Sequence, residues 1–367
     1  MAKAKGAKGN RSSRETPASL QKKIEKLDAE LLKLCNQRAD LTLKLAEVQP
    51  EAVAPEISDE DHLAALVARN PGPLPEQAVR HIIRELISGS RSLIHRTRVA
   101  YLGPAYSYSH LAAIEYFGQS VELVPVGAIG AVFEEVYRGH SNFGIVPLEN
   151  STDGRVADTL EMFTRLPVRI CGEVQLRIHH HLLGKCDRSE VIEVYSRPQA
   201  LSQCRNWLAR HLPTARTVPV TSTSTAAQLA QDKPGAAAIA SLQAGKHYGL
   251  NVLAENIEDN AANVTRFAVI GDRSAPRTGK DKTALMFEVD HKVGALADAT
   301  AVLKRARLNM TWIESFPAPN RQGAYLFFCE VEGHENDSAV KRALEGLKRK
   351  CLMLEVLGSY ERATAIG

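Results

Sequence analysis

The sequence has no long hydrophobic run and almost no charge imbalance outside its first residues. No stretch of 18 residues is uninterruptedly apolar, so we predict no transmembrane helix. The N-terminal 15 residues lack the apolar core of a secretory signal, and the six cysteines are scattered without a CxxC pair. We therefore expect a cytoplasmic protein with reduced thiols and no zinc site. With 44% hydrophobic and 24% charged residues, the 367-residue chain predicts two or three globular domains.

The formal net charge is only +4, and five basic residues and one acid in the first 15 positions account for all of it. The remainder is formally neutral, which argues against a basic groove for nucleic acid. We expect residues 1–16 to be a disordered basic tail, with nucleic-acid contact as the alternative, and no membrane partner.

Several catalytic motifs are also missing. There is no GxGxxG after a strand, no GxxxxGK[ST], no GxSxG and no HExxH, so nicotinamide, ATP, α/β-hydrolase and zincin chemistry lose support. We expect no cofactor and no metal. His179, His180 and His181 suggest a metal site, but only alternate residues of a strand share a face, so we favour one inward histidine.

Three regions differ in their periodicity. Residues 17–96 predict an all-α domain, because Leu20 to Val48 follow an unbroken heptad seam and a third helix runs from about 75 to 95. Arg38 interrupts the first seam and Ser90 that of the third helix. One interpretation is that Arg38 contributes to an anion site inside the bundle. The other is that Arg38 is structural, with its charge extended to solvent or paired with a carboxylate. These two interpretations stay open on the pattern alone.

Residues 97–272 alternate short strands with helices, which predicts α/β layers with mostly parallel strands, one of them spanning 167–182. Residues 273–282 are a predicted linker. Residues 283–362 follow a βαββαβ pattern, that of a ferredoxin-like domain.

Three polar segments of the middle region follow or begin predicted strands, where α/β folds bind ligands. They are residues 103–110, 149–154 and 263–267. Hydroxyls and free backbone N–H groups at such places suit a carboxylate or phosphate. Each segment is weak evidence by itself, since such residues are usually caps or turns. Together they indicate a small-anion site.

The residues in and around these segments resemble prephenate dehydratase. The similarity runs through YLGPAYSYSHLAA (101–113), GIVPLENSTDGRV (144–156), YSRPQALSQC (195–204) and residues 248–267, with an ACT-type domain behind them. The helical start resembles the AroQ-type chorismate mutase domain of bacterial bifunctional enzymes. The resemblance implies an all-α N-terminal domain, a two-lobed, periplasmic-binding-protein-like α/β catalytic domain and a regulatory ACT domain.

The resemblance also implies a reaction and its residues. Prephenate would lose CO2 and its ring hydroxyl to give phenylpyruvate, in phenylalanine biosynthesis. Thr265 would help the hydroxyl leave, with Asn150 and Ser151 as its catalytic partners. Arg266 would clamp a substrate carboxylate, and the other implied substrate-binding residues are Ser107, Thr152 and Phe267. Ala105 and Tyr106 depart from the family's Gly-Pro-Glu-Gly-Thr segment, and a differently shaped cleft would follow.

The mutase-like domain departs further. Arg38 and Ser90 match polar positions of the family, whereas Gln21, Gln49 and Ile94 replace an arginine, a lysine and a Gln/Glu. We therefore predict weak or absent mutase activity and a role in dimerisation; the alternative is a fully bifunctional enzyme.

In the ACT-type domain, two segments match the family's phenylalanine-site motifs: Gly294, Ala295 and Leu296, then Glu314 and Ser315, with Phe316 replacing an arginine. The resemblance implies feedback inhibition by phenylalanine in a dimer or tetramer. The alternative from another class is a non-catalytic sensor of small anions and amino acids.

Overall fold

The computed structural model describes residues 16–53, 59–318 and 324–366 and forms two compact units, whose boundary along the chain falls between Val53 and Ala54. The predicted tail lies almost wholly outside the described residues. Nowhere in the described ranges does a helix have both the length and the apolar character needed to cross a bilayer.

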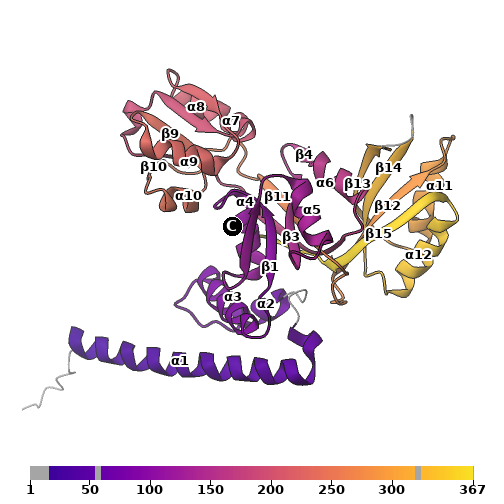
Figure 1. Ribbon diagram of the computed structural model, residues 1–367, viewed down its shortest axis with the longest axis horizontal. Helices are drawn as coiled ribbons and strands as arrows, with labels where there is room; N and C mark the ends of the chain where they lie inside the picture. The colour runs from indigo at the N-terminus through magenta and orange to yellow at the C-terminus, as the bar shows by residue number, and fades with distance from the viewer. Residues whose placement is uncertain (1–15, 54–58, 319–323, 367) are drawn as a thin grey trace, which may run out of the picture. The chain divides into compact units, whose positions relative to one another are not determined.

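The first unit is essentially one helix, α1 (Pro17–Val48), followed by the short η1 (Pro50–Val53). Thr16 caps it by accepting the N–H of Ser19 at 3.2 Å. Figure 1 shows α1 as a single unbroken helix. None of its residues is buried, and seam leucines such as Leu27 and Leu41 are 63% and 65% exposed. The predicted helix is confirmed, and its apolar seam has no cover within its own unit.

The second unit opens with α2 (Glu60–Ala68) and α3 (Glu76–Ser92). Asp59 joins them, because its carboxylate accepts two hydrogen bonds from Arg91 at 2.7 and 3.0 Å. Ser90 is buried, and its hydroxyl donates to the carbonyl of Leu86 at 2.6 Å. The Ser90 hydroxyl, which interrupts the apolar seam of α3, is therefore hydrogen-bonded to the backbone of its own helix.

A seven-stranded sheet follows, in the order β16-β5-β11-β3-β1-β2 with β4 paired to β3. The bounds are β1 (Arg98–Leu102), β2 (Glu122–Val126), β3 (Phe143–Asn150), β4 (Gly154–Arg155), β5 (Arg169–Arg177), β11 (Val264–Gly271) and β16 (Ala365–Ile366). β1, β2 and β3 are parallel, but β11 is antiparallel to both β3 and β5. Among the described residues, β1, β2, β3, β5 and β16 therefore run in one direction and β11 and the short β4 in the other, so the expectation of mostly parallel strands is confirmed for this sheet.

The second sheet has five strands in the order β10-β6-β9-β7-β8. These are β6 (His181–Gly184), β7 (Glu193–Ser196), β8 (Arg216–Pro219), β9 (Ala236–Ala240) and β10 (Asn251–Ala254). Its helices are α7 (Pro198–Gln203), α8 (Arg205–His211), α9 (Thr223–Asp232) and α10 (Leu242–His247), besides the short η2 (Arg188–Glu190). The two sheets with their helices are the two lobes expected of the middle region, and the chain passes between them twice.

The histidine run lies at the first of these crossings. The predicted strand over 167–182 is wrong, because β5 ends at Arg177 and β6 begins at His181 in the other sheet. His180 and His181 are both buried, and His179 pairs with Glu258 at 2.8 Å. In the described ranges no group of three or more His, Cys, Asp or Glu side chains is arranged to hold a metal ion.

Helices α4 (Tyr108–Phe117), α5 (Ile129–Tyr137) and α6 (Ala157–Phe163) pack on the first sheet. On β11, Phe267 and Val269 belong to the core on one face, whereas Ala268 and Ile270 belong to the core on the other. This strand alternation decides which residues of the 263–267 segment face the cleft.

The last domain is an antiparallel sheet in the order β13-β14-β12-β15, with α11 (Ala295–Arg305) and α12 (Ser338–Lys348) on one face (Figure 1). Its strands are β12 (Asp281–Val289), β13 (Met310–Pro317), β14 (Tyr325–Glu332) and β15 (Cys351–Glu361). The predicted βαββαβ order is confirmed. Ala284, Met286 and Phe328, on the other face, share one apolar core with Val146 and Ile270 of the first sheet.

Candidate active site

A cleft of about 770 Å³ is lined by residues of both lobes. The first lobe contributes the loop after β1, the end of β3 and the start of β11, and the second contributes α7 and the start of α9. Among the lining residues are Ser107, Tyr108, Asn150, Arg155, His180, Arg197, Gln203, Thr223, Thr225, Thr265 and Phe267. All three polar segments of the sequence therefore reach one cavity.

Strand register brings the central pair together. On the antiparallel strands β3 and β11, Asn150 lies directly opposite Thr265. The Asn150 side-chain amide donates to the Thr265 hydroxyl oxygen at 2.8 Å and to Asn263 Oδ1 at 2.9 Å. Its own Oδ1 accepts the backbone N–H groups of Thr152 and Asp153 at 3.0 and 3.1 Å. Asn150 is thus held from both ends and fixes the Thr265 oxygen.

A hydrogen-bond chain continues from this pair into the second lobe. Gln203 Oε1 accepts from Asn263 Nδ2 at 3.0 Å and lies 2.9 Å from His180 Nε2. The Gln203 amide nitrogen donates to Asp153 at 2.7 Å. Gln203 and Asn263 were not assigned from the sequence, although both lie in segments that resemble the dehydratase family.

Two helices of ten residues each begin at this cleft. Ser107 caps α4 by accepting the N–H of His110 at 3.3 Å, and Ser222 caps α9 by accepting the N–H of Thr225 at 2.9 Å. The positive ends of the helix dipoles favour a negatively charged ligand. Arg155 of the first lobe and Arg197 of the second also line the cleft and offer positive charge to an anion, and Asp153 and Asp158 of the first lobe line it as well.

Ser151 and Thr152 lie beside the cleft rather than on its lining. The Ser151 hydroxyl accepts the N–H of Val264 at 2.9 Å and donates to the Ala262 carbonyl at 3.3 Å. The Ser151 hydroxyl therefore holds the start of β11 next to the end of β3. The backbone N–H of Thr152 orients Asn150, as described above.

Arg266 lies on the face of β11 away from the cleft. Because neighbours on a strand face opposite ways, Thr265 and Phe267 line the cleft while Arg266 points to the other face of β11. There its guanidinium pairs with Glu149, Glu173 and Glu330 at 2.8, 2.7 and 2.6 Å. The expectation that Arg266 clamps a substrate carboxylate is therefore wrong in this structure. Arg155, which does line the cleft, was missed.

Tyr106, the bulky departure from the family pattern, also points elsewhere. Its ring stacks on His247 of the second lobe with centroids 4.1 Å apart, and Ser224 donates to the Ala105 carbonyl at 2.7 Å. Its φ of 64° lies in the left-handed region, which costs a non-glycine residue about 1 kcal/mol or more. Neither Ala105 nor Tyr106 lines the cleft, and the Tyr106 ring instead contacts the second lobe through His247.

Burial favours the neutral form of three histidines, two of them at the crossing. Burial lowers the pKa of His180, although Gln203 and Glu258 oppose the shift, and burial likewise lowers the pKa of His110 and His181. A neutral His180 that donates from Nε2 to Gln203 keeps the chain of bonds to Thr265 intact.

These shifts predict a loss of stability in mild acid. A histidine whose folded pKa is lowered contributes stability above its unfolded pKa of about 6.5, and loses it as the pH falls toward the folded value. We expect the urea midpoint to drop between about pH 7.5 and 5.5, before carboxylates titrate. For a histidine that stays neutral in the fold, the whole fall from pH 7.5 to 5.5 costs about 1.4 kcal/mol, most of it below the unfolded pKa. An unchanged midpoint across this range would contradict the prediction.

The expected regulatory residues do not all lie on one face of the ACT sheet. Gly294 caps α11 and Ala295 begins it, and Leu296 packs in the core under α11 and α12. Ser315 lies opposite Phe327 on that helical face, whereas Glu314 lies opposite Phe328 on the face toward the catalytic lobe. Glu314 pairs there with Arg155 at 2.9 Å, which connects the ACT sheet to the rim of the cleft.

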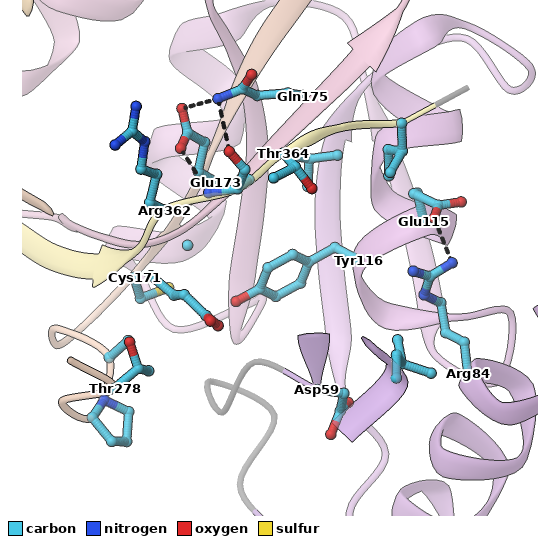
Figure 2. A pocket seen from close by; sticks show the side chains of 18 of the residues that line it. Asp59, Arg84, Glu115, Tyr116, Cys171, Glu173, Gln175, Thr278, Arg362 and Thr364 are labelled. Atoms are coloured by element: carbon cyan, nitrogen blue, oxygen red, sulfur yellow. Dashed lines mark hydrogen bonds and ion pairs between the residues drawn. The ribbon is translucent and has the colours of Figure 1, made fainter. Parts of the chain in front are cut away.

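A second, smaller cavity of about 190 Å³ lies behind β5, between Arg84, Tyr116 and the segments around Thr278 and Thr364. In Figure 2 Tyr116 projects between these groups. Glu173 forms part of its wall, with hydrogen bonds to Gln175 and to the backbone N–H of Ala363. The cavity thus borders Glu173, one of the carboxylates that hold Arg266.

Comparison with known proteins agrees with this architecture. Family models match in three successive ranges: chorismate mutase type II at 20–95, prephenate dehydratase at 99–275 and ACT domain at 283–349. A protein of Aquifex aeolicus named bifunctional chorismate mutase/prephenate dehydratase is 40% identical over 94% of this chain and 97% of its own.

Two solved structures each cover 72% of the chain. Prephenate dehydratase from Arthrobacter aurescens in complex with L-Phe is 34% identical, with a TM-score of 0.67 over 90% of that chain. A protein described as a novel type of quorum-quenching acylase is 29% identical, with a TM-score of 0.66 over 98% of that chain. With identity this high over nearly the whole length of the Aquifex relative, the chain belongs to the family of bifunctional chorismate mutase/prephenate dehydratases.

Proposed function

We propose that this protein converts prephenate to phenylpyruvate, with loss of CO2 and water. In that reaction the bond from the ring to its carboxylate breaks, its electron pair aromatises the ring, and the ring hydroxyl leaves with a proton. Aromatisation supplies the driving force. The protein must hold the dianion and assist the departing hydroxyl.

One observation carries the proposal: the hydrogen bond from Asn150 to the Thr265 oxygen at 2.8 Å. Because the Thr265 oxygen already accepts from Asn150, its O–H is left to donate toward the cleft. A positioned donor of this kind contributes about 10²–10⁴-fold to a proton-coupled step. Orientation inside the cleft would supply a further share of the acceleration.

The charges of the cleft suit the substrate. Prephenate carries two carboxylates, and the starts of α4 and α9 together with Arg155 and Arg197 supply the complementary charge. We assign carboxylate binding to these groups in place of Arg266. Phe267, which lines the cleft, offers an apolar contact to the ring.

The direct test is to incubate the purified full chain with prephenate and follow phenylpyruvate by its absorbance, with and without phenylalanine. We expect turnover without added metal or cofactor, and a lower rate with phenylalanine. Binding of prephenate without any product would favour the sensor alternative and reject the enzyme.

We further propose regulation by phenylalanine and a homo-oligomeric, cytoplasmic protein. The ACT domain and the L-Phe complex of the Arthrobacter relative support the first point. The exposed apolar seam of α1 supports a homo-oligomer, because an apolar stripe of this length on one helix requires a partner surface. The absence of phenylalanine effects on both rate and melting temperature would reject the regulatory part.

Observations both for and against concern the chorismate mutase activity of the N-terminal helical region. The family match at 20–95 and the bifunctional relatives favour both activities. Gln21 and Gln49, which lack the charges expected at their positions, favour weak turnover of chorismate. We expect Gln21→Arg combined with Gln49→Lys to raise chorismate consumption by about tenfold, since one preorganised charge is worth this much or more. A fast wild-type rate that the double variant leaves unchanged would establish the bifunctional alternative.

A further inference from the structure

Behind the catalytic strand lies a buried cluster of charges that joins two domains. Arg266 on β11 and Glu173 on β5 belong to the catalytic region, and Lys282 on β12 and Glu330 on β14 belong to the ACT sheet. The side chains of Glu330, Glu173, Lys282 and Arg266 are 1%, 2%, 5% and 14% exposed. Two positive and two negative side chains thus lie together away from water, and the more exposed Glu149 adds a third carboxylate.

Each nitrogen of the Arg266 guanidinium has its own carboxylate. Nε donates to Glu173 at 2.7 Å, Nη1 to Glu149 at 2.8 Å and Nη2 to Glu330 at 2.6 Å. The planar guanidinium therefore links three strands, β3, β5 and β14, to β11. A lysine could not do this, because its ammonium is a point charge without the rigid fork.

The ACT carboxylate is itself held in place. Glu330 accepts from Tyr360 at 2.7 Å and from Lys282 at 3.1 Å, and Lys282 also pairs with Glu173 at 2.9 Å. Burial by itself would lower the pKa of Arg266, but Glu173 and Glu330 raise it above its ordinary value. The opposite charges of the cluster compensate one another, and removal of one member leaves a buried charge without its partner.

Arg266 directly follows Thr265, whose oxygen must stay at hydrogen-bond distance from Asn150. We propose that Arg266 is a positioning residue for Thr265 and that Glu330 of the ACT sheet is its required counter-ion. The ACT domain then takes part in the geometry of the cleft as well as in regulation. This inference rests on the dehydratase function proposed above.

The test compares Glu330→Gln with Glu332→Gln in the full chain. Glu332 is the matched control, because it lies two residues further on β14, is 45% exposed and pairs only loosely with Arg362 at 3.4 Å. We expect Glu330→Gln to lower kcat for prephenate about 10-fold to 100-fold with KM within about twofold, since a small displacement of a reacting group costs this much. Glu332→Gln should match the wild type.

Arg266→Lys is the second variant, and it keeps the charge while it removes the fork. It should show the same split between kcat and KM, and it remains informative if Glu330→Gln does not fold. All assays are done well below the melting temperature of each variant, so that the loss of kcat is not a loss of folded protein.

Amide hydrogen exchange over residues 262–268 supplies a readout that does not need turnover. We expect faster exchange there in Glu330→Gln and Arg266→Lys, and no change in Glu332→Gln. Unchanged kcat and unchanged exchange in a folded Glu330→Gln protein would overturn the inference. If the wild type does not turn over prephenate, the proposed function fails, and the exchange result alone decides whether Glu330 positions β11.

Discussion

Thr265→Val should lower prephenate turnover by about 10²–10⁴-fold. Valine keeps the shape of threonine, but it removes the O–H that the Asn150 contact leaves free to assist the departing hydroxyl. Asn150 keeps Asn263 as an acceptor, so the stability cost should stay at about 1 kcal/mol. The loss should appear in kcat, because the valine variant still has the charged groups that bind the dianion. The measurement is steady-state formation of phenylpyruvate.

Thr265→Ser is the matched control for this prediction. Serine keeps the hydroxyl and should retain most of the activity, at a modest cost from its freer rotamer. A valine variant with turnover within about threefold of the wild type would show that the Thr265 hydroxyl does not take part, and Asn150 would then lose its proposed catalytic role.

Gly358→Ala should separate the ACT sheet from the catalytic lobe. Gly358 has a φ of 146°, and a Cβ there would lie 2.0 Å from the Ile170 carbonyl oxygen and 2.9 Å from the Ile170 nitrogen. These are backbone atoms of β5, which cannot rotate away as a side chain can. We expect a loss of about 3 kcal/mol in the free energy of unfolding. Dehydratase activity should also fall, because Arg266 and Glu330 meet across the same contact between the domains.

Gly139→Ala is the control for backbone strain. Gly139 has a φ of 70°, and a Cβ at this position would meet no other atom within 4 Å, so only the conformational cost of about 1 kcal/mol should be observed. Urea unfolding of both variants, followed by circular dichroism, measures the difference. Equal effects would mean that the approach of β15 to β5 is not as close in solution, and the proposed link between the domains would lose its basis.

Contacts between the ACT sheet and the catalytic lobe offer a route by which regulation could reach the cleft. Glu314, expected from the resemblance to belong to a phenylalanine site, pairs with Arg155 at the rim of the cleft. This ion pair and the charge cluster behind β11 are two of the contacts that connect the ACT sheet to the catalytic lobe. Both lie on the sheet face opposite α11 and α12, so movement of the ACT sheet would affect both at once.

The sequence by itself determined the order of the domains, the long first helix, the βαββαβ pattern and the three polar segments of the cleft. Such features depend on local periodicity and on short motifs, which can be read along the chain. Tertiary structure alone decided the partners of Arg266, the end of β5 before the chain crosses to the other sheet at His181, and the direction of β11. These depend on strand register and on which face of a strand meets another domain, and neither is encoded in the spacing of residues within one segment. Thr265 and Arg266 are adjacent in the chain, yet one faces the substrate cleft and the other the ACT sheet, because a strand sends neighbouring side chains to opposite sides.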